Sequence, residues 1–337
     1  MRRLLRIAII TACASVAQAV CCPCGAYAGI KTSDLNSAEP GYSWKFSYVQ
    51  LTDIHIGHGT TDYASPGYDD TLSGVTEGRP EKNLREAVEY INAHRGKLKI
   101  KFVVVTGDIT HHAQRSEFLK AREILNGLSI PYVPVIGNHD VWPFSSGGEA
   151  APSPIGGLYF REIFAQEFAR LKTFFPEWQD AYVPPQSATA TATGYLQNYA
   201  FRYDGYWFAA PDIIGRAHAP TVGSPVTVDL FKHEGGTWDW LSRYYSSSTA
   251  EKKHIVVLAH YPITSEDFKG ERLFQREYEA IAGLLSSREA IGLWNSGHMH
   301  RNKQYRADYN GKNITSVIET GTNRKKTTLR VIRVWDK

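Results

Sequence analysis

Apolar residues occur along this chain in two patterns, one typical of strands and one typical of amphipathic helices. Five runs rich in apolar and β-branched residues predict strands, and they cover residues 46–51, 100–106, 132–136, 254–258 and 290–294. The second run is apolar enough to predict a strand that is buried on both faces. Residues 81–95 and 115–128 carry apolar side chains at helical spacing and predict helices. Strands that alternate with helices favour an α/β fold.

Two turn sequences predict hairpins in the second half of the chain. Asp204-Gly205 separates the strand-like segments 199–203 and 206–210, and Asn310-Gly311 separates 304–309 and 313–318. Both dipeptides are typical of two-residue hairpin loops, because their residues tolerate a left-handed backbone. A short helix is predicted at 237–245 and a last strand at 329–335.

The long interval after the third strand predicts an insertion rather than a second domain. A helix is expected near residues 159–173, and residues 184–193, rich in Ser, Ala and Thr, predict a surface loop. No internal repeat is visible. We therefore expect one domain over residues 45–337, with an insertion around residues 141–200.

Composition and charge exclude few classes of protein. The chain has 337 residues, 42% hydrophobic and 21% charged, which suffices for a sizeable core. The net charge is only +4, and Lys and Arg are scattered along the sequence. A nucleic-acid-binding surface would need a basic face or stripe, so none of any extent is expected. A small anionic substrate is compatible with this charge.

The first 28 residues have the features of a secretory signal peptide. A basic start is followed by an apolar stretch and by two small-residue cleavage sites, which end at Ala19 and Ala28. All four cysteines lie within the first 24 residues, so cleavage after Ala28 would leave none. The alternative is an uncleaved membrane anchor. We expect a secreted or periplasmic protein, with no membrane span in the mature chain if residues 1–28 are removed.

Polar residues with metal-binding side chains follow each of the five predicted strands. They are Asp53, His55, Asp108, Asn138, His139, His260, His298 and His300. Because ligands bind at the carboxyl ends of strands in α/β sheets, these side chains are expected to meet at one edge. Carboxylate, imidazole and amide groups bind divalent cations. Two such cations, about 3.5–4 Å apart, would activate water as a nucleophile and clamp a phosphoryl group.

The order of these blocks, D-x-H, GD, GNHD, AH and GHxH, resembles the calcineurin-like metallophosphoesterase superfamily, and most of all its bacterial cyclic-nucleotide phosphodiesterase-like branch. The resemblance covers residues 46–300. It implies a four-layer α/β/β/α sandwich of two mixed sheets flanked by helices. It also implies one metal on Asp53, His55, Asp108 and His300, and another on Asp108, Asn138, His260 and His298. His139 would be the general acid for the leaving group.

Together with the predicted signal peptide, this resemblance implies a secreted, two-metal phosphoric ester hydrolase. A phosphodiesterase is the preferred interpretation, with a metal-bridging hydroxide as the nucleophile. A phosphomonoesterase or nucleotide pyrophosphatase of the same fold is the alternative, and a non-catalytic binding scaffold is a further one. The metals could be Mn, Fe or Zn, and the natural substrate and the oligomeric state are left open. His58, His111 and His112 are interpreted as surface or loop histidines.

Overall fold

The fold is that of a computed structural model. It describes residues 42–59, 77–143, 155–182, 186–189, 192–216, 228–231, 234–246, 255–264, 275–286 and 292–336. The predicted signal peptide, residues 1–28, lies outside these residues.

The first sheet contains the strands that carry the first three polar blocks. Its strands lie in the order β13-β1-β2-β3. They are β13 (Arg330–Asp336), β1 (Ser43–Leu51), β2 (Ile100–Thr106) and β3 (Tyr132–Val135). β1, β2 and β3 run parallel, whereas β13 is antiparallel to β1. The three parallel strands therefore end at the same edge of the sheet.

The second sheet has seven strands and carries the last two blocks. Its order is β11-β12-β10-β9-β8-β7-β4. The strands are β11 (Lys303–Tyr309), β12 (Lys312–Glu319), β10 (Gly292–Ser296), β9 (Ile255–Leu258), β8 (Tyr206–Ala210), β7 (Gln197–Tyr203) and β4 (Gln179–Tyr182). The central strands β8, β9, β10 and β12 are parallel, and the outer pairings are antiparallel. Both sheets are mixed, as predicted.

The two sheets pack face to face through an aromatic core. Tyr48 of β1 stacks on Phe102 of β2, with ring centroids 5.4 Å apart. Phe208 of β8 meets Phe102 edge-on from the second sheet, with ring centroids 5.3 Å apart. These large rings fill the space between the two sheets and hold the sheets together.

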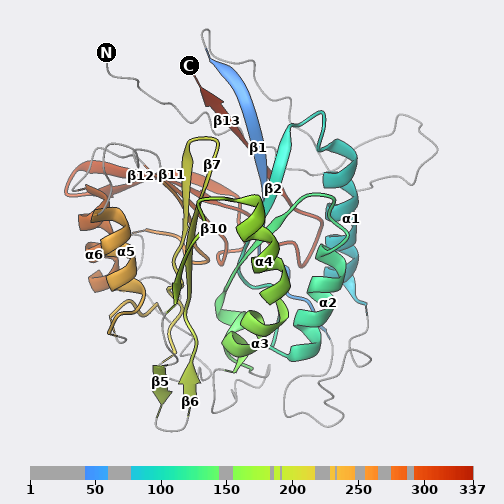
Figure 1. The fold of residues 1–337 in the computed structure, drawn as a ribbon, viewed down its shortest axis with the longest axis horizontal. Coiled ribbons are helices and arrows are strands. Elements are labelled where there is room, and N and C mark those ends of the chain that lie inside the picture. Colours follow the sequence, from blue (N-terminus) through green and yellow to red (C-terminus); the bar gives the residue numbers. More distant parts are fainter. Residues whose placement is uncertain are drawn as a thin grey trace.

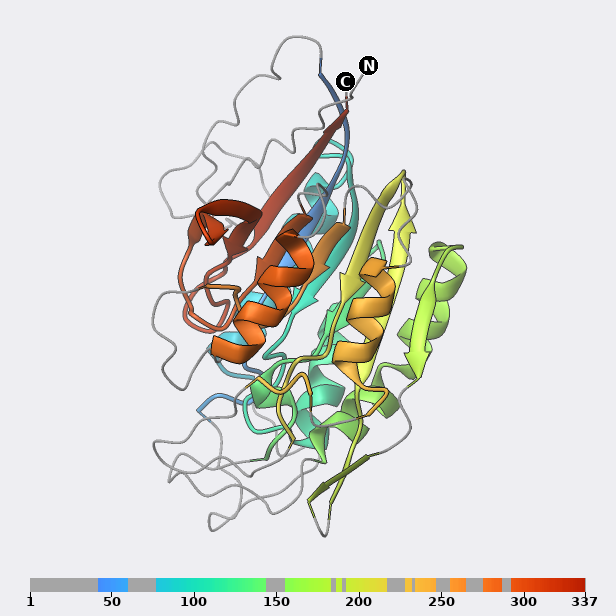
Figure 2. The same ribbon diagram turned by 90° about the vertical axis from the view of Figure 1, so that its left-hand side faces the viewer.

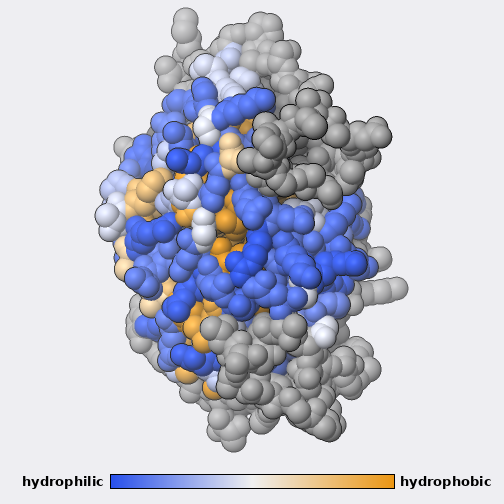
Figure 3. Space-filling view, turned by 90° about the vertical axis from the view of Figure 1, so that its right-hand side faces the viewer, coloured by the Kyte–Doolittle hydropathy of each residue, from blue (hydrophilic) through white to orange (hydrophobic). Residues whose placement is uncertain are grey.

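Helices cover both outer faces (Figures 1 and 2). α1 (Arg79–His94) and α2 (Arg115–Leu125) pack on the first sheet, and α5 (Thr237–Ser246) and α6 (Gln275–Ser286) pack on the second. α4 (Ala165–Phe174) lies beside β3, and α3 (Gly156–Ile163) packs against α2 and α4. The side of the molecule on which α1 lies is largely hydrophilic, with apolar side chains visible only in narrow areas (Figure 3). The predicted four-layer α/β/β/α sandwich is confirmed.

Most predicted elements lie within a few residues of their expected positions, and one prediction in the insertion is wrong. Residues 184–193 were expected to be a loop, but β5 (Gln186–Thr189) and β6 (Ala192–Gly194) pair as a separate antiparallel two-stranded sheet. Short polar strands of this kind have no apolar pattern by which a sequence could distinguish them from a loop. The boundaries of the domain and its insertion stay a prediction.

Candidate metal centre

The five polar blocks meet where the two sheets come together at their carboxyl edges. Backbone hydrogen bonds continue past the strand ends, from Asp53 N to Gly107 O (3.0 Å) and from Gly297 N to His260 O (3.0 Å). Gln50 joins the two sheets directly below, because its Nε2 donates to Thr106 Oγ1 (2.8 Å) and to Ser296 O (3.0 Å). The loops of both sheets are therefore held at fixed positions relative to each other.

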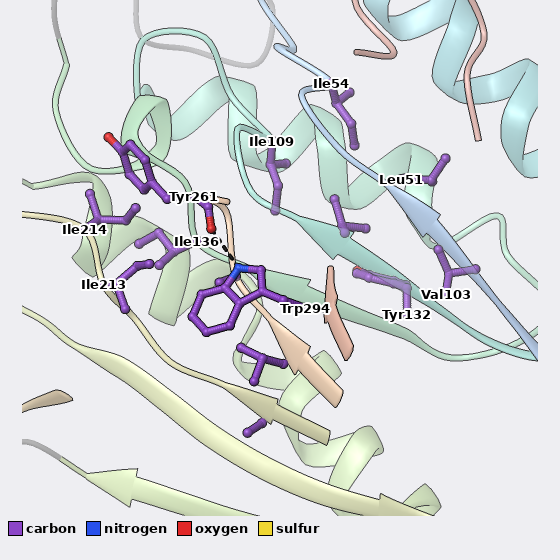
Figure 4. Packing of buried hydrophobic residues seen from close by; sticks show 14 of the residues in the cluster. Leu51, Ile54, Val103, Ile109, Tyr132, Ile136, Ile213, Ile214, Tyr261 and Trp294 are labelled. Carbon is purple, nitrogen blue, oxygen red and sulfur yellow. Dashed lines mark hydrogen bonds between the residues drawn. The ribbon is translucent and has the colours of Figure 1, made fainter. Parts of the chain in front are cut away.

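An apolar layer supports the centre from beneath. Ile109, Ile136 and Trp294 of β10 belong to the same buried hydrophobic cluster (Figure 4). The Trp294 indole donates to the carbonyl of Tyr261 at 2.9 Å. The Tyr261 ring in turn lies against the ring of His298, with centroids 4.3 Å apart. The imidazole of His298 is thus oriented by packing as well as by polar contacts.

Five of the predicted metal ligands have a left-handed backbone. The φ angles are 50° at Asp53, 55° at His55, 50° at Asp108, 64° at His298 and 52° at His300. This region is uncommon for residues other than glycine, although Asp and His tolerate it better than most. Local strain of this kind concentrates at functional sites, where the surrounding structure imposes it.

The first cluster contains Asp53, His55, Asp108 and His300. One donor atom from each lies within 4.8 Å of those of the others. His300 Nε2 is 3.1 Å from Asp53 Oδ1 and 3.2 Å from His55 Nε2, and His55 Nε2 is 3.6 Å from Asp108 Oδ2. Asp53, His55 and Asp108 are buried, and His300 is half-buried. This is the set predicted for one metal.

The second cluster contains Asp108, His260 and His298, again with donor atoms within 4.8 Å of one another. Asn138 joins it, because its Oδ1 lies 3.0 Å from His260 Nε2 and 3.1 Å from His298 Nδ1. Asp108 Oδ2 is 3.2 Å from His260 Nε2. Asp108 is the one residue that both clusters share, which is the position of a bridging ligand.

The protonation of His260 tests whether this arrangement suits a cation. Its Nδ1 donates to the carbonyl of Thr106 at 2.9 Å. Its Nε2 faces two oxygens, of Asp108 and Asn138, so this edge needs either a second proton or a bound cation. Burial opposes a charge on the ring, but Asp108 raises the pKa of His260 to about 9. Burial and His139 hold the pKa of His55 well below its usual value, which keeps that ring neutral. Both features fit divalent cations.

His139 lies beside the two clusters in an orientation suited to proton transfer. Its Nδ1 donates to the carbonyl of His111 at 2.7 Å, and its backbone N–H donates to Asp108 Oδ1 at 2.9 Å. Nε2 is then the ring nitrogen whose proton can be transferred. Burial lowers the pKa of His139, and Asp108 opposes this effect. His139, His298 and His300 are the half-buried members of the site, so a substrate approaches from their side.

Asp140, which the sequence analysis did not select, joins two of the blocks. Its carboxylate accepts hydrogen bonds from the backbone N–H groups of Gly137 (2.8 Å), Thr110 (2.8 Å) and Ile109 (3.2 Å). Burial and the nearby Asp108 raise the pKa of Asp140 to about 7. Asp140 therefore fixes the loop after β2 against the loop after β3, and so orients both Asp108 and Asn138.

All three histidines interpreted as surface or loop residues have partners in the structure, and the ring of His58 lies edge-on to that of His111, with centroids 4.7 Å apart. His111 Nδ1 is 3.1 Å from His55 Nδ1, and its ring is nearly parallel to that of His139, with centroids 5.2 Å apart. His112 is buried and lies 3.1 Å from a carboxylate oxygen of Glu117. The only signal in the sequence for His111 and His112 was their position three and four residues after Asp108.

Known proteins with a similar sequence or fold allow this site to be compared. The family model of the calcineurin-like phosphoesterases matches residues 46–302. No curated protein matches the chain by sequence. A dimetal phosphatase from Danio rerio has a similar structure, with a TM-score of 0.54, 14% identity and coverage of 86% of this chain and 92% of that chain.

Two more distant structures also match. A putative 5′-nucleotidase from Staphylococcus aureus has a TM-score of 0.45 and 16% identity, and it covers 86% of this chain and 50% of that chain. A purple acid phosphatase from yellow lupin has a TM-score of 0.45 and 12% identity, with coverage of 81% and 43%.

The sequence match and the geometry agree over the same part of the chain. The matched residues include every block of the site, and the Danio rerio structure supports the same fold. In the part that the structure describes, no helix has the length and hydropathy needed to span a membrane. The chain belongs to the calcineurin-like phosphoesterase family and is a phosphoric ester hydrolase with donors for two divalent metal ions.

Proposed function

We propose that this protein hydrolyses phosphodiesters, with Asp108 as the ligand that bridges two metal ions. The observation that supports this most directly is that both clusters of donor atoms share the Asp108 carboxylate. When bound, two divalent cations supply an activated water molecule and neutralise charge on the phosphoryl oxygens. Mn, Fe and Zn all suit a mixed set of carboxylate and imidazole ligands.

The residues of the chain itself have three tasks in this proposal. The buried carboxylates and imidazoles hold the cations, and Asn138 adds an amide oxygen to the second of them. His139 donates the proton from Nε2 to the leaving oxygen, because its Nδ1 is occupied by the carbonyl of His111. Asp140 and His111 orient these groups without being ligands themselves.

The preference for a diester rests on the pattern of the blocks, which is most similar to the cyclic-nucleotide phosphodiesterase-like branch. Hydrolysis of a diester releases an alkoxide or phenoxide that needs a proton, and a histidine placed beside the centre can supply it. A monoester releases the same kind of group, so His139 suits both substrates. Phosphomonoesterase and nucleotide pyrophosphatase activities use the same core and are the runner-up. We further propose that residues 1–28 direct the protein out of the cytoplasm.

The test is hydrolysis of bis(p-nitrophenyl) phosphate compared with p-nitrophenyl phosphate. The protein is stripped with a chelator and reloaded with Mn, Fe, Zn or Mg in turn. Metal-dependent cleavage of the diester, with little cleavage of the monoester, is the expected result. A preference for the monoester would contradict the proposed phosphodiesterase activity and favour a phosphomonoesterase. If no metal is bound after reloading, a non-catalytic binding scaffold is the only hypothesis that remains.

A further inference from the structure

The peptide unit between His111 and His112 is hydrogen-bonded on both sides. Its carbonyl, which belongs to His111, accepts from Nδ1 of His139 at 2.7 Å. Its N–H, which belongs to His112, donates to Oε2 of Glu117 at 2.9 Å. The peptide is trans, so its carbonyl and N–H groups point in opposite directions. Glu117, this peptide and the ring of His139 therefore form one chain of hydrogen bonds.

The carboxylate of Glu117 is fully buried and has further partners. Its Oε2 also accepts from the backbone N–H of Gln114 at 3.2 Å, and its Oε1 lies 3.1 Å from Nδ1 of His112. Burial raises the pKa of Glu117, and its contacts with His112 oppose this effect. N–H donors favour the charged form of a carboxylate, and a hydrogen bond to a charged acceptor is stronger than one between neutral groups. Glu117 can thus hold the peptide more firmly than a neutral side chain would.

The backbone around this carboxylate is shaped to approach it. Ala113 lies between the two residues whose N–H groups donate to Glu117, and it is buried with a φ angle of 53°. A residue with a Cβ rarely adopts this left-handed conformation, which persists only where the surrounding structure imposes it. In the loop after β1, a Cβ at Gly57 would stand 1.9 Å from Oε1 of Glu117. The loops after β1 and β2 therefore both fit closely around this side chain.

A role as a helix cap does not explain all of these contacts. Glu117 accepts from the N–H of the N-cap residue of α2, as part of a capping box. α1 has a capping box of the same kind, in which Oε2 of Glu81 accepts from the N–H of Gly78 at 2.7 Å. Among the described contacts, only Glu117 of these two glutamates binds a peptide that holds His139. Glu81 therefore shows what capping alone contributes.

We propose that Glu117 is a positioning residue for proton transfer, because it holds the His111–His112 peptide so that the carbonyl keeps a proton on Nδ1 of His139 and leaves Nε2 to face the leaving group. This inference rests on the proposed function, in which His139 is the general acid. The proton moves from Nε2 to the leaving oxygen as that oxygen takes the electron pair of its bond to phosphorus, and the ring keeps its proton on Nδ1. Glu117 acts through the peptide and does not itself react.

The experiment compares two diesters whose leaving groups differ in their need for a proton. p-Nitrophenolate is stable enough to leave bis(p-nitrophenyl) phosphate unprotonated, whereas the phenolate of diphenyl phosphate depends more on a general acid. The ratio of turnover on the two substrates is measured with the metal-loaded protein, and metal content is measured by elemental analysis. A variant that is less folded or holds less metal loses turnover on both substrates alike, so its ratio does not change.

The variants are Glu117→Ala and Glu117→Gln, with Glu81→Gln as the matched control, since it alters the same kind of capping box. We expect Glu117→Ala to lower turnover on diphenyl phosphate about tenfold to a hundredfold, and turnover on bis(p-nitrophenyl) phosphate less than about threefold. Glu117→Gln should lie between Glu117→Ala and the wild type, because its amide oxygen can still accept from the peptide but has no charge. Glu81→Gln should keep the wild-type ratio. An equal loss on both substrates in Glu117→Gln would overturn the proposal, and so would an equal change of ratio in Glu81→Gln.

A second measurement tests the positioning without turnover. In isotope-labelled, zinc-loaded protein above neutral pH, NMR shows which ring nitrogen of His139 carries the proton, and His139→Gln assigns the signal. We expect the proton on Nδ1 in the wild type and in Glu81→Gln, and a mixture of the two forms in Glu117→Ala. The same form in all three proteins would overturn the proposal. If the form depends on Glu117 while no diester is hydrolysed with any metal, the positioning stands and the proposed phosphodiesterase activity fails.

Discussion

The metal-free protein should lose stability as the pH rises from 7 to 9, because of His260. Asp108 raises the pKa of this buried ring to about 9 despite the opposing effect of burial. In the unfolded chain the pKa of histidine is about 6.5. The folded state therefore binds the proton more tightly, so the stabilisation is complete below pH 6.5 and is lost as the pH rises through 9.

The size of this loss follows from the two pKa values. With a pKa of about 9 in the folded state and about 6.5 in the unfolded state, proton binding stabilises the fold by about 2.6 kcal/mol at pH 7 and about 0.4 kcal/mol at pH 9. The expected loss over this interval is about 2 kcal/mol. Asp140, with a pKa raised to about 7 by burial and by Asp108, changes stability mainly at lower pH. A cation on Nε2 takes the place of the proton, so the metal-loaded protein should lack this dependence.

The assay is urea unfolding in the presence of a chelator at pH 7, 8 and 9, followed by tryptophan fluorescence. The control is His260→Gln, which removes the titrating ring and should be nearly insensitive to pH in this range. The reasoning is refuted if the wild type and His260→Gln lose the same stability between pH 7 and 9. It is also refuted if the wild type becomes more stable as the pH rises.

Three substitutions test the roles of individual residues. His139→Ala should lower turnover about 10²- to 10⁴-fold and leave the metal content unchanged, since His139 transfers a proton and holds no metal; full activity would remove it from the mechanism. Asp108→Asn should lose metal and activity together, because both clusters share this carboxylate; a normal metal content by elemental analysis would contradict the bridging assignment. Gly297→Ala should weaken metal binding, because its Cβ would stand 2.3 Å from Asp53 Oδ2, whereas Gly283→Ala, with nothing within 4 Å, is the control. Equal metal affinity of these two glycine variants would show that the close contact is relieved without moving Asp53.

Sequence alone could predict those parts of the fold that depend on local pattern. The strand at residues 100–106 coincides with β2, because its apolar run is a property of consecutive residues. The second hairpin was predictable for a similar reason, since its turn needs two residues with a left-handed backbone and Asn310 and Gly311 have φ angles of 52° and 74°. α6 was not predicted, although its buried residues Tyr278, Ile281, Ala282 and Leu285 have helical spacing.

The groups that orient the ligands could not be predicted, because their partners are distant in the sequence. Thr322 and Asp53, which hold the segment after β12 to the metal centre, are 269 positions apart. His111 contacts His55 across 56 positions, and Asp140 contacts Thr110 across 30. Such residues have ordinary identities for a loop, and only the three-dimensional structure distinguishes them from solvent-exposed ones.

The ligands were predictable because chemistry and backbone geometry select the same few residue types at the strand ends. A Cβ at Gly137 would stand 2.1 Å from the backbone nitrogen of Asp108, and one at Gly107 would stand 2.5 Å from His260 Nδ1. Glycine is therefore required next to the ligands so that the loops of the two sheets can approach. Five of the seven predicted ligands also have a left-handed backbone, which Asp and His tolerate better than β-branched residues do. Blocks such as GD and GHMH therefore contain both the metal ligands and the glycines that allow the loops to pack closely. For this reason a short set of residues identifies the whole site.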